Sequence, residues 1–117
     1  MTSIGDDDRD PKLRARMSAT LAATFAAFKP RIAILNNGAV KGGAPETFAA
    51  LHGLPDVDVW QLHRSTNAGA RNFSDDRIAN LDETTAHWIK VRARDDGSFV
   101  LTNGRTGESK SYASVVR

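Results

Sequence analysis

The chain has 117 residues, of which 40% are hydrophobic and 26% charged, with a formal net charge of +2 and no cysteine. This length allows one domain with its own hydrophobic core and is too short for two. The composition is typical of a folded globular domain and not of a disordered tail. The absence of cysteine excludes disulfides, thiolate chemistry and cysteine-ligated zinc.

The N-terminal segment differs from the rest of the chain. Residues 1–9 are polar and rich in aspartate, so we predict a flexible acidic leader followed by a single α/β domain over residues 10–117. The leader lacks the basic start and apolar middle of a signal peptide. No apolar run approaches the roughly 18–20 residues that span a bilayer. We therefore expect a cytoplasmic protein with no membrane partner.

The first half of the chain alternates helical and strand patterns. Apolar residues at steps of three and four predict a helix over 11–28, which Pro30 ends. Residues 32–35 are apolar without alternation, as in a strand buried on both faces. A short helix is predicted over 45–52 and a second strand over 57–63. Because a helix connects the two strands, we expect them to be parallel.

The second half ends in a different pattern. Ser74 and the two aspartates after it predict the start of a third short helix, over 74–80. From position 87, apolar and polar residues alternate, which indicates a strand with one solvated face. Its apolar side carries His87, Ile89, Val91 and Ala93, and its polar side Trp88, Lys90, Arg92 and Arg94. Asp96-Gly97 predicts a hairpin turn into a strand over 99–102. With a last strand near 110–113, the chain is expected to end as an antiparallel meander.

Basic residues are scattered and mixed with acidic ones. The densest basic segment, Lys90 to Arg94, is followed at once by Asp95 and Asp96. Proteins that bind nucleic acids usually concentrate basic residues on one face. We therefore expect no nucleic-acid partner.

Several separated segments resemble, in the same order, the C-terminal part of bacterial metallo-β-lactamase-fold hydrolases, most closely the competence-protein-like branch. The similarity covers about residues 28–113. Its segments are AILNNG at 33–38 with KGG at 41–43, WQLH at 60–63, IANL at 78–81, HWIKV at 87–91, DGSF at 96–99 and TNGR at 102–105.

Members of that fold are αββα sandwiches that hold one or two zinc ions and hydrolyse phosphoesters, thioesters or lactams with metal-bound hydroxide. Their metal is bound mainly by an HxHxDH motif and later His and Asp residues. This chain contains no HxHxDH, and Lys41-Gly42-Gly43-Ala44 stands where related enzymes place a late ligand histidine. The resemblance therefore implies the scaffold without the family's metal ligands.

The resemblance and the element pattern together predict an α/β fold: a mixed sheet with helical crossovers that ends in an antiparallel hairpin or meander, forming half of an αββα sandwich. Half a sandwich leaves apolar sheet surface bare. We therefore expect a homodimer in which each chain supplies the other's missing half.

Three histidines, His52, His63 and His87, are the candidate metal ligands, because three imidazoles, or two and a carboxylate, suffice for catalytic zinc. His63 ends the second predicted strand, and Asp58 lies on the same strand. Their spacing matches no metal motif, so structural roles stay open. His52 would then sit at a helix C-terminus, and His87 would be a hydrogen-bonded core residue.

The polar turn after the first predicted strand is the candidate substrate site. Ligand sites of open α/β sheets lie outside the carboxyl ends of the strands. There, Asn36, Asn37 and Lys41 could orient a substrate oxygen, and the backbone at Gly38 could approach an anion. The alternative is a simple Asn-Gly turn with a positive φ angle.

Two functions follow from these observations. In the first, a homodimer hydrolyses a small phosphoester-type substrate with a bound metal ion, for which zinc is the candidate. His63 would hold the metal with His52, His87 or Asp58, and Lys41 and Asp58 would assist catalysis. In the second, the chain is a non-catalytic C-terminal fragment or assembly module that lacks the metal site.

Overall fold

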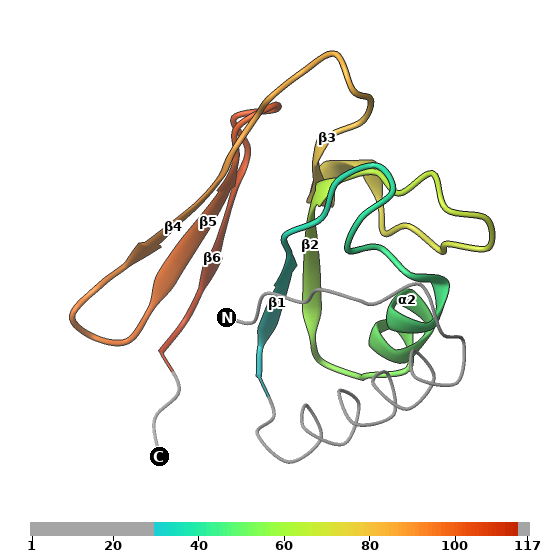
Figure 1. The fold of residues 1–117 in the computed structure, drawn as a ribbon. Helices are drawn as coiled ribbons and strands as arrows, with labels where there is room; N and C mark the ends of the chain where they lie inside the picture. The colour runs from blue at the N-terminus through green and yellow to red at the C-terminus, as the bar shows by residue number, and fades with distance from the viewer. Residues whose placement is uncertain (1–29, 115–117) are drawn as a thin grey trace.

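Two three-stranded sheets and one helix make up residues 30–114, the part of the chain that the computed structural model describes. Sheet A is parallel with strand order β1-β2-β3, and sheet B is antiparallel with order β4-β5-β6. Helix α2 packs on one face of sheet A and sheet B on the other, so the layers run helix, sheet, sheet (Figure 1). The predicted leader and the helix over 11–28 lie outside the described residues.

Sheet A begins with the elements that the sequence predicts. Strand β1 is Ile32–Leu35, helix α2 is Pro45–His52, and strand β2 is Asp58–His63. The two strands are parallel, with Ile34 opposite Trp60. Alternate residues of β1 face different layers, because Ala33 and Leu35 pack with α2 while Ile32 packs with sheet B. A strand buried on both faces explains the unbroken apolar run.

The predicted helix over 74–80 is wrong. Only one 3-10 turn forms, η1 at Asp75–Arg77, and the chain then enters strand β3, Ile78–Asn80. All three residues of β3 are buried, and it pairs in parallel with β2 through Gln61 and His63. Burial beside β2 overrides the local helix signal, because strand formation depends mainly on packing context. The second crossover of sheet A is therefore a loop and not a helix.

Sheet B contains strands β4 (Ile89–Ala93), β5 (Phe99–Asn103) and β6 (Ser109–Tyr112). In the β4–β5 register Val91 lies opposite Leu101, so the apolar residues of β4 share the face of sheet B that is turned toward sheet A. Lys90 and Arg92 lie on the outer face. The predicted meander is thus confirmed. The predicted single solvated face of β4 is wrong beyond Ile89, because Val91 and Ala93 are exposed as well as Lys90 and Arg92.

The two sheets meet in a small apolar core. Its buried residues are Ile32 and Trp60 from sheet A, and Leu101 and Tyr112 from sheet B. Burying a side chain of this kind stabilises a fold by about 1.5–3 kcal/mol. Asn103, fully buried in β5, donates from Nδ2 to the backbone oxygen of Ile78 (3.0 Å) and so adds a polar link between the sheets.

Replacing Gly104 with alanine is expected to destabilise the protein by about 1–3 kcal/mol, because the added methyl group would overlap the Trp88 backbone, which is held by its hydrogen bond from Gly104 N. An added Cβ would lie 2.7 Å from both the ring Cδ2 and the backbone oxygen of Trp88. Urea unfolding measures the change. Gly38→Ala is the matched control, since nothing lies within 4 Å of a Cβ there. Equal stability of the two variants would contradict this packing.

Candidate functional site

The carboxyl edge of sheet A holds the predicted substrate residues, and one of them is a buried structural link. Asn37 is 5% exposed. Its Nδ2 donates to the backbone oxygen of His63 (2.8 Å), and its Oδ1 accepts from the backbone nitrogen of His63 (3.2 Å). The amide thus replaces a backbone pair where β1 ends and satisfies two groups that need partners. Its hydrogen bonds are used within the fold.

The other predicted residues of this edge lie on the open side of the loop. Asn36 and Lys41 are exposed, and the backbone nitrogen of Gly38 donates to the backbone oxygen of Lys41 (2.8 Å) to close a turn. The positive φ expected at Gly38 occurs instead at Gly42, whose φ is 76°. The structure thus brings Asn36, Asn37, Gly38 and Lys41 to one loop, with only Asn36 and Lys41 turned to solvent.

Side chains after β2 fix this loop in place. Ser65 donates from Oγ to the backbone oxygen of Gly43 (3.1 Å), and Thr66 donates from Oγ1 to that of Ala39 (3.0 Å). Asn67 donates from Nδ2 to Gly43 as well (2.9 Å). The polar residues at this edge therefore satisfy loop carbonyls, which is the ordinary requirement for buried backbone.

The three histidines occupy separate places. His52, at the end of α2, pairs through Nε2 with the backbone oxygen of Arg71 (2.7 Å). His63, at the end of β2, pairs through Nδ1 with the backbone oxygen of the next residue (2.7 Å). His87 precedes β4, and its backbone nitrogen donates to Oδ1 of Asn80 (2.7 Å). Among residues 30–114 no group of three His, Asp or Glu side chains is placed to hold a metal ion.

Asp58 and His63, predicted to act together, lie at opposite ends of β2. Five residue steps at about 3.3 Å each separate them by about 16 Å along the strand. The carboxylate influenced by His63 is Asp82, whose pKa is lowered first by hydrogen bonds from Thr84 and further by His63. The structure therefore does not assemble the predicted catalytic set of His63, Asp58 and Lys41.

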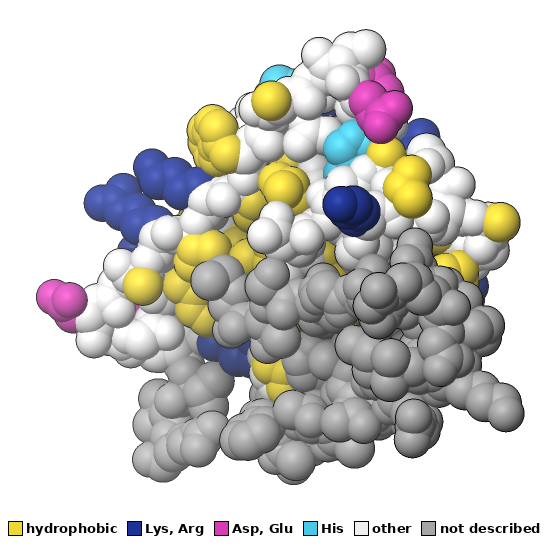
Figure 2. All heavy atoms as spheres, in the orientation of Figure 1, with side chains coloured by type: hydrophobic (Ala, Val, Ile, Leu, Met, Phe, Trp, Pro, Cys, Tyr) yellow, Lys and Arg dark blue, Asp and Glu magenta, His cyan; other side chains and the backbone are white. Residues whose placement is uncertain are grey.

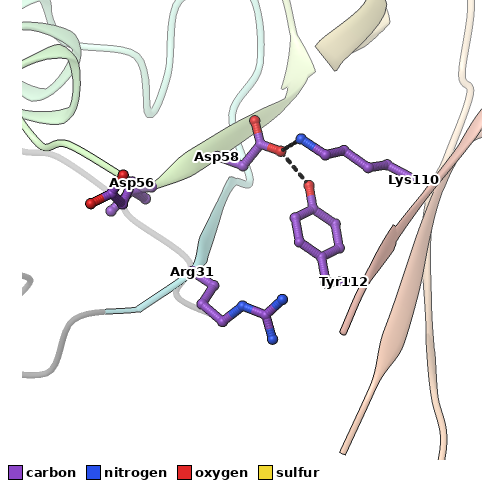
Figure 3. A pocket seen from close by; sticks show the side chains of 6 residues that line it. Arg31, Asp56, Asp58, Lys110 and Tyr112 are labelled. Carbon is purple, nitrogen blue, oxygen red and sulfur yellow. Dashed lines mark hydrogen bonds and ion pairs between the residues drawn. The ribbon is translucent and has the colours of Figure 1, made fainter. Parts of the chain in front are cut away.

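Asp58 instead borders a cavity at the amino end of sheet A. The cavity has a volume of about 470 Å³ and opens to solvent between β2 and β6. Figure 3 shows Lys110 and Tyr112 directed toward Asp58, while the Arg31 guanidinium points away from Asp58. Val57 and Asp56 complete the lining. This site lies at the edge of the sheet opposite to the one expected from the sequence.

Three side chains bind the Asp58 carboxylate. Tyr112 OH and Lys110 Nζ both donate to Oδ2 (2.5 Å each), and Arg77 Nε donates to Oδ1 (3.3 Å). Burial raises the pKa of Asp58, but these hydrogen bonds and the Arg77 charge outweigh it and hold the pKa below its usual 3.8. Asp58 is therefore an ionised acceptor that joins sheet A to sheet B.

Tyr112 is the neutral partner in this arrangement. Its ring stacks on Phe99, and its hydroxyl accepts from Trp60 Nε1 (3.0 Å) while donating to Asp58. Burial, together with the hydrogen bond to Asp58, raises the pKa of Tyr112 to about 12. General acid–base catalysis works best with groups whose pKa lies near the working pH. Since Asp58 and Tyr112 are both shifted away from neutrality, the cluster is suited to holding the sheets together and not to moving protons.

Arg31 and Lys110 are the two cationic side chains that line the cavity. Its guanidinium lies over the rings of Phe99 (5.3 Å) and Tyr112 (5.7 Å), and it donates to the backbone oxygen of Ala113. Arginine has five N–H donors in a rigid fork, and the Ala113 oxygen is the one hydrogen-bond acceptor of Arg31 among residues 30–114. Lys110, with side-chain exposure of 45%, borders the same space.

A second exposed feature lies around strand β4 of sheet B, on both of its faces. Trp88 is 53% exposed and Val91 38% exposed. Figure 2 shows Lys and Arg side chains projecting from the left of the molecule, the side that sheet B occupies in Figure 1. Lys90 and Arg92 of β4 are exposed, and neither has an ion pair or side-chain hydrogen bond with any residue between 30 and 114.

Sequence reasoning missed the cluster around Asp58 because its members are far apart in the chain. One signal was present: Asp58 is the one acidic residue of the second strand, and Lys110 and Tyr112 alternate on the last strand, so they share a face. The contact between β6 and β2, which belong to different sheets, can be recognised only from the tertiary fold. Arg31 and Arg77 gave no local signal.

No family model matches the chain, and no curated protein or solved structure is significantly similar to it. Within the described residues, no helix has the length and apolar character required to cross a membrane.

Asn37→Ala is expected to lower the free energy of unfolding by about 1–3 kcal/mol, because it leaves the partly buried backbone N–H of His63 without its acceptor and leaves the His63 oxygen with Gln61 Nε2 as its donor. Chemical denaturation measures this loss. The control is Asn36→Ala at the exposed neighbouring position, with an expected change within about 0.5 kcal/mol. A neutral Asn37→Ala would show that the bridge between β1 and β2 contributes nothing.

The titration of Tyr112 is isolated optically, because it is the one tyrosine in the sequence. Ultraviolet absorbance of the tyrosinate should give a midpoint near 12. The raised pKa stabilises the fold below the unfolded value of about 10, and this contribution is lost as pH rises from there through about 12.

Asp58→Asn removes the negative charge that Tyr112 faces and should move the tyrosinate midpoint downward. Circular dichroism at each pH serves as the control for folding. A midpoint near 10 in the folded wild-type protein, or no change in Asp58→Asn, would contradict the hydrogen bond between the two side chains.

Proposed function

We propose that this chain is a non-catalytic assembly module, the second of the two functions that the sequence left open. The observation that supports it most is the exposure of β4. Sheet B is the outermost layer, and its strand farthest from sheet A has an intermediate first residue followed by four exposed ones. Exposed apolar surface next to an unpaired strand edge is typical of an interaction site.

The arrangement of titratable groups gives less support to a hydrolase. Zinc catalysis needs three protein ligands around one open position. The described histidines lie at three separate places, and ring nitrogens of His52 and His63 are bonded to backbone oxygens. Asp58 and Tyr112 serve as an ionised acceptor and a neutral donor. A metal-dependent hydrolase acting on a small phosphoester would require ligands from a second chain, which remains the competing prediction.

The layer order of helix, sheet and sheet supports descent from the metallo-β-lactamase scaffold, because that fold contains the same succession of layers. In this proposal the chain has kept part of the scaffold without the HxHxDH motif. Cytoplasmic location and homodimer formation stay predictions.

Metal analysis combined with a hydrolysis assay tests the proposal. After incubation with zinc and dialysis, the wild-type protein should retain only substoichiometric zinc. Its rate with a generic phosphodiester should equal that of His63→Ala and be unchanged by a chelator, since His63 has no ligand partners within its own chain's described residues. Stoichiometric zinc and hydrolysis that His63→Ala abolishes would overturn the proposal and establish the enzyme.

A further inference from the structure

The hydrogen-bond pattern of β4 shows which backbone groups lie on its free edge. Gly104 N donates to the backbone oxygen of Trp88 (2.8 Å), and Arg94 N donates to that of Ser98 (2.9 Å). Hydrogen-bonded pairs alternate along an antiparallel ladder. Lys90 and Arg92 therefore also direct their backbone groups toward β5.

The intervening residues Ile89, Val91 and Ala93 direct their N–H and C=O groups away from β5. Strand β4 is an edge strand of sheet B, and these groups have no backbone partner among residues 30–114. Three consecutive edge positions thus offer a donor and an acceptor each. An extended segment can use such an edge as the template for one more strand.

The two faces of β4 differ in chemistry, and this determines what would pair with it. Ile89, Val91 and Ala93 form an apolar row on the face toward sheet A, whereas Lys90 and Arg92 form a basic row on the outer face. Cross-strand neighbours on one face lie about 4.5–5.5 Å apart and interact directly. An added strand would need apolar residues beside the first row and acidic residues beside the second.

A second copy of this chain fits the edge poorly. In a two-fold antiparallel pairing centred on Val91, Lys90 of each chain would lie opposite Arg92 of the other. Both pairs would be like-charged, and like charges directly opposite each other destabilise a sheet. Such charges on an edge strand are a common protection against self-association. A homodimer would have to form through another surface.

We propose that the free edge of β4 binds an extended acidic segment of a partner protein, with alternating apolar and acidic residues, as an additional antiparallel strand of sheet B. This inference rests on the proposed assembly function and names the partner's chemistry. The backbone of Ile89, Val91 and Ala93 supplies the hydrogen bonds, and Lys90 and Arg92 supply the charge selection.

Single-stranded nucleic acid is the competing ligand for the outer face, because Trp88 lies near the two basic residues and exposed aromatic rings stack on bases. Two observations favour the peptide. A nucleic acid would leave the backbone edge and the apolar row unused. Asp95 and Asp96, both exposed, follow β4 and reduce the positive charge available to a phosphate chain.

Fluorescence anisotropy with a labelled peptide of alternating glutamate and valine tests the inference on the full chain. Binding is expected, with affinity reduced about tenfold or more for a lysine–valine peptide and for a peptide of the same composition in blocks. Val91→Pro removes one outward N–H without touching a bond to β5, as proline allows at an edge. It should weaken binding about tenfold relative to Val91→Ala, which keeps that N–H.

Lys90→Glu combined with Arg92→Glu should reverse the preference, so that the lysine–valine peptide binds and the glutamate–valine peptide does not. This variant keeps the test decisive if Val91→Pro fails to fold by circular dichroism. Equal binding of both peptides, or unchanged binding in the double variant, overturns the inference.

Three further results also overturn the inference: tighter binding of oligothymidylate than of the acidic peptide, dimerisation that Val91→Pro abolishes, and no binding of any probe. If no probe binds, β4 also loses its support as a docking element in the proposed assembly function. The zinc and hydrolysis result bears only on the proposed function, so the two failures are distinguishable.

Discussion

The hydroxyl of Tyr112 crosses from sheet B to sheet A, where it donates to Asp58 and accepts from Trp60. This contact links the last strand of the chain to the first half of the fold, and the apolar core beside it buries Leu101 against Trp60. The sheets are thus joined through β5 and β6. Because β4 lies beyond them in the strand order, its far edge and much of its surface stay exposed.

The buried polar groups likewise serve to hold neighbouring elements together. Buried amides such as Asn37 and Asn103 are occupied with backbone groups of neighbouring strands and loops. Asp58 is surrounded by donors, which keeps it ionised and Tyr112 neutral. A catalytic site requires groups whose pKa lies near the working pH and whose hydrogen bonds are free for substrate. Within residues 30–114, the candidate catalytic groups Asp58 and Tyr112 join the two sheets. The exposed charged side chains of β4 take no part in this link.

Local patterns in the sequence were sufficient for much of the fold and little of the site. The apolar run of β1, the helix at Pro45–His52 and the strand at Ile89–Ala93 each depend on neighbouring residues, and each was predicted. Strand β3 was missed because its conformation is imposed by pairing with β2. The Asp58 cluster was missed for the same reason, since residues more than fifty positions apart meet only when sheet B packs on sheet A. The structural role of Asn37 could not be read from the sequence, because it follows from the burial of its side chain in the fold.

The proposed docking role of β4 requires an edge that is open in the free protein. Amide hydrogen exchange, resolved by residue, measures this directly. Lys90 and Arg92, which donate toward β5, should exchange slowly, whereas Ile89, Val91 and Ala93 should exchange at rates close to those of unstructured peptide and become protected when an acidic strand binds. Slow exchange at Val91 in the isolated chain would show that the edge is already covered and would contradict the account.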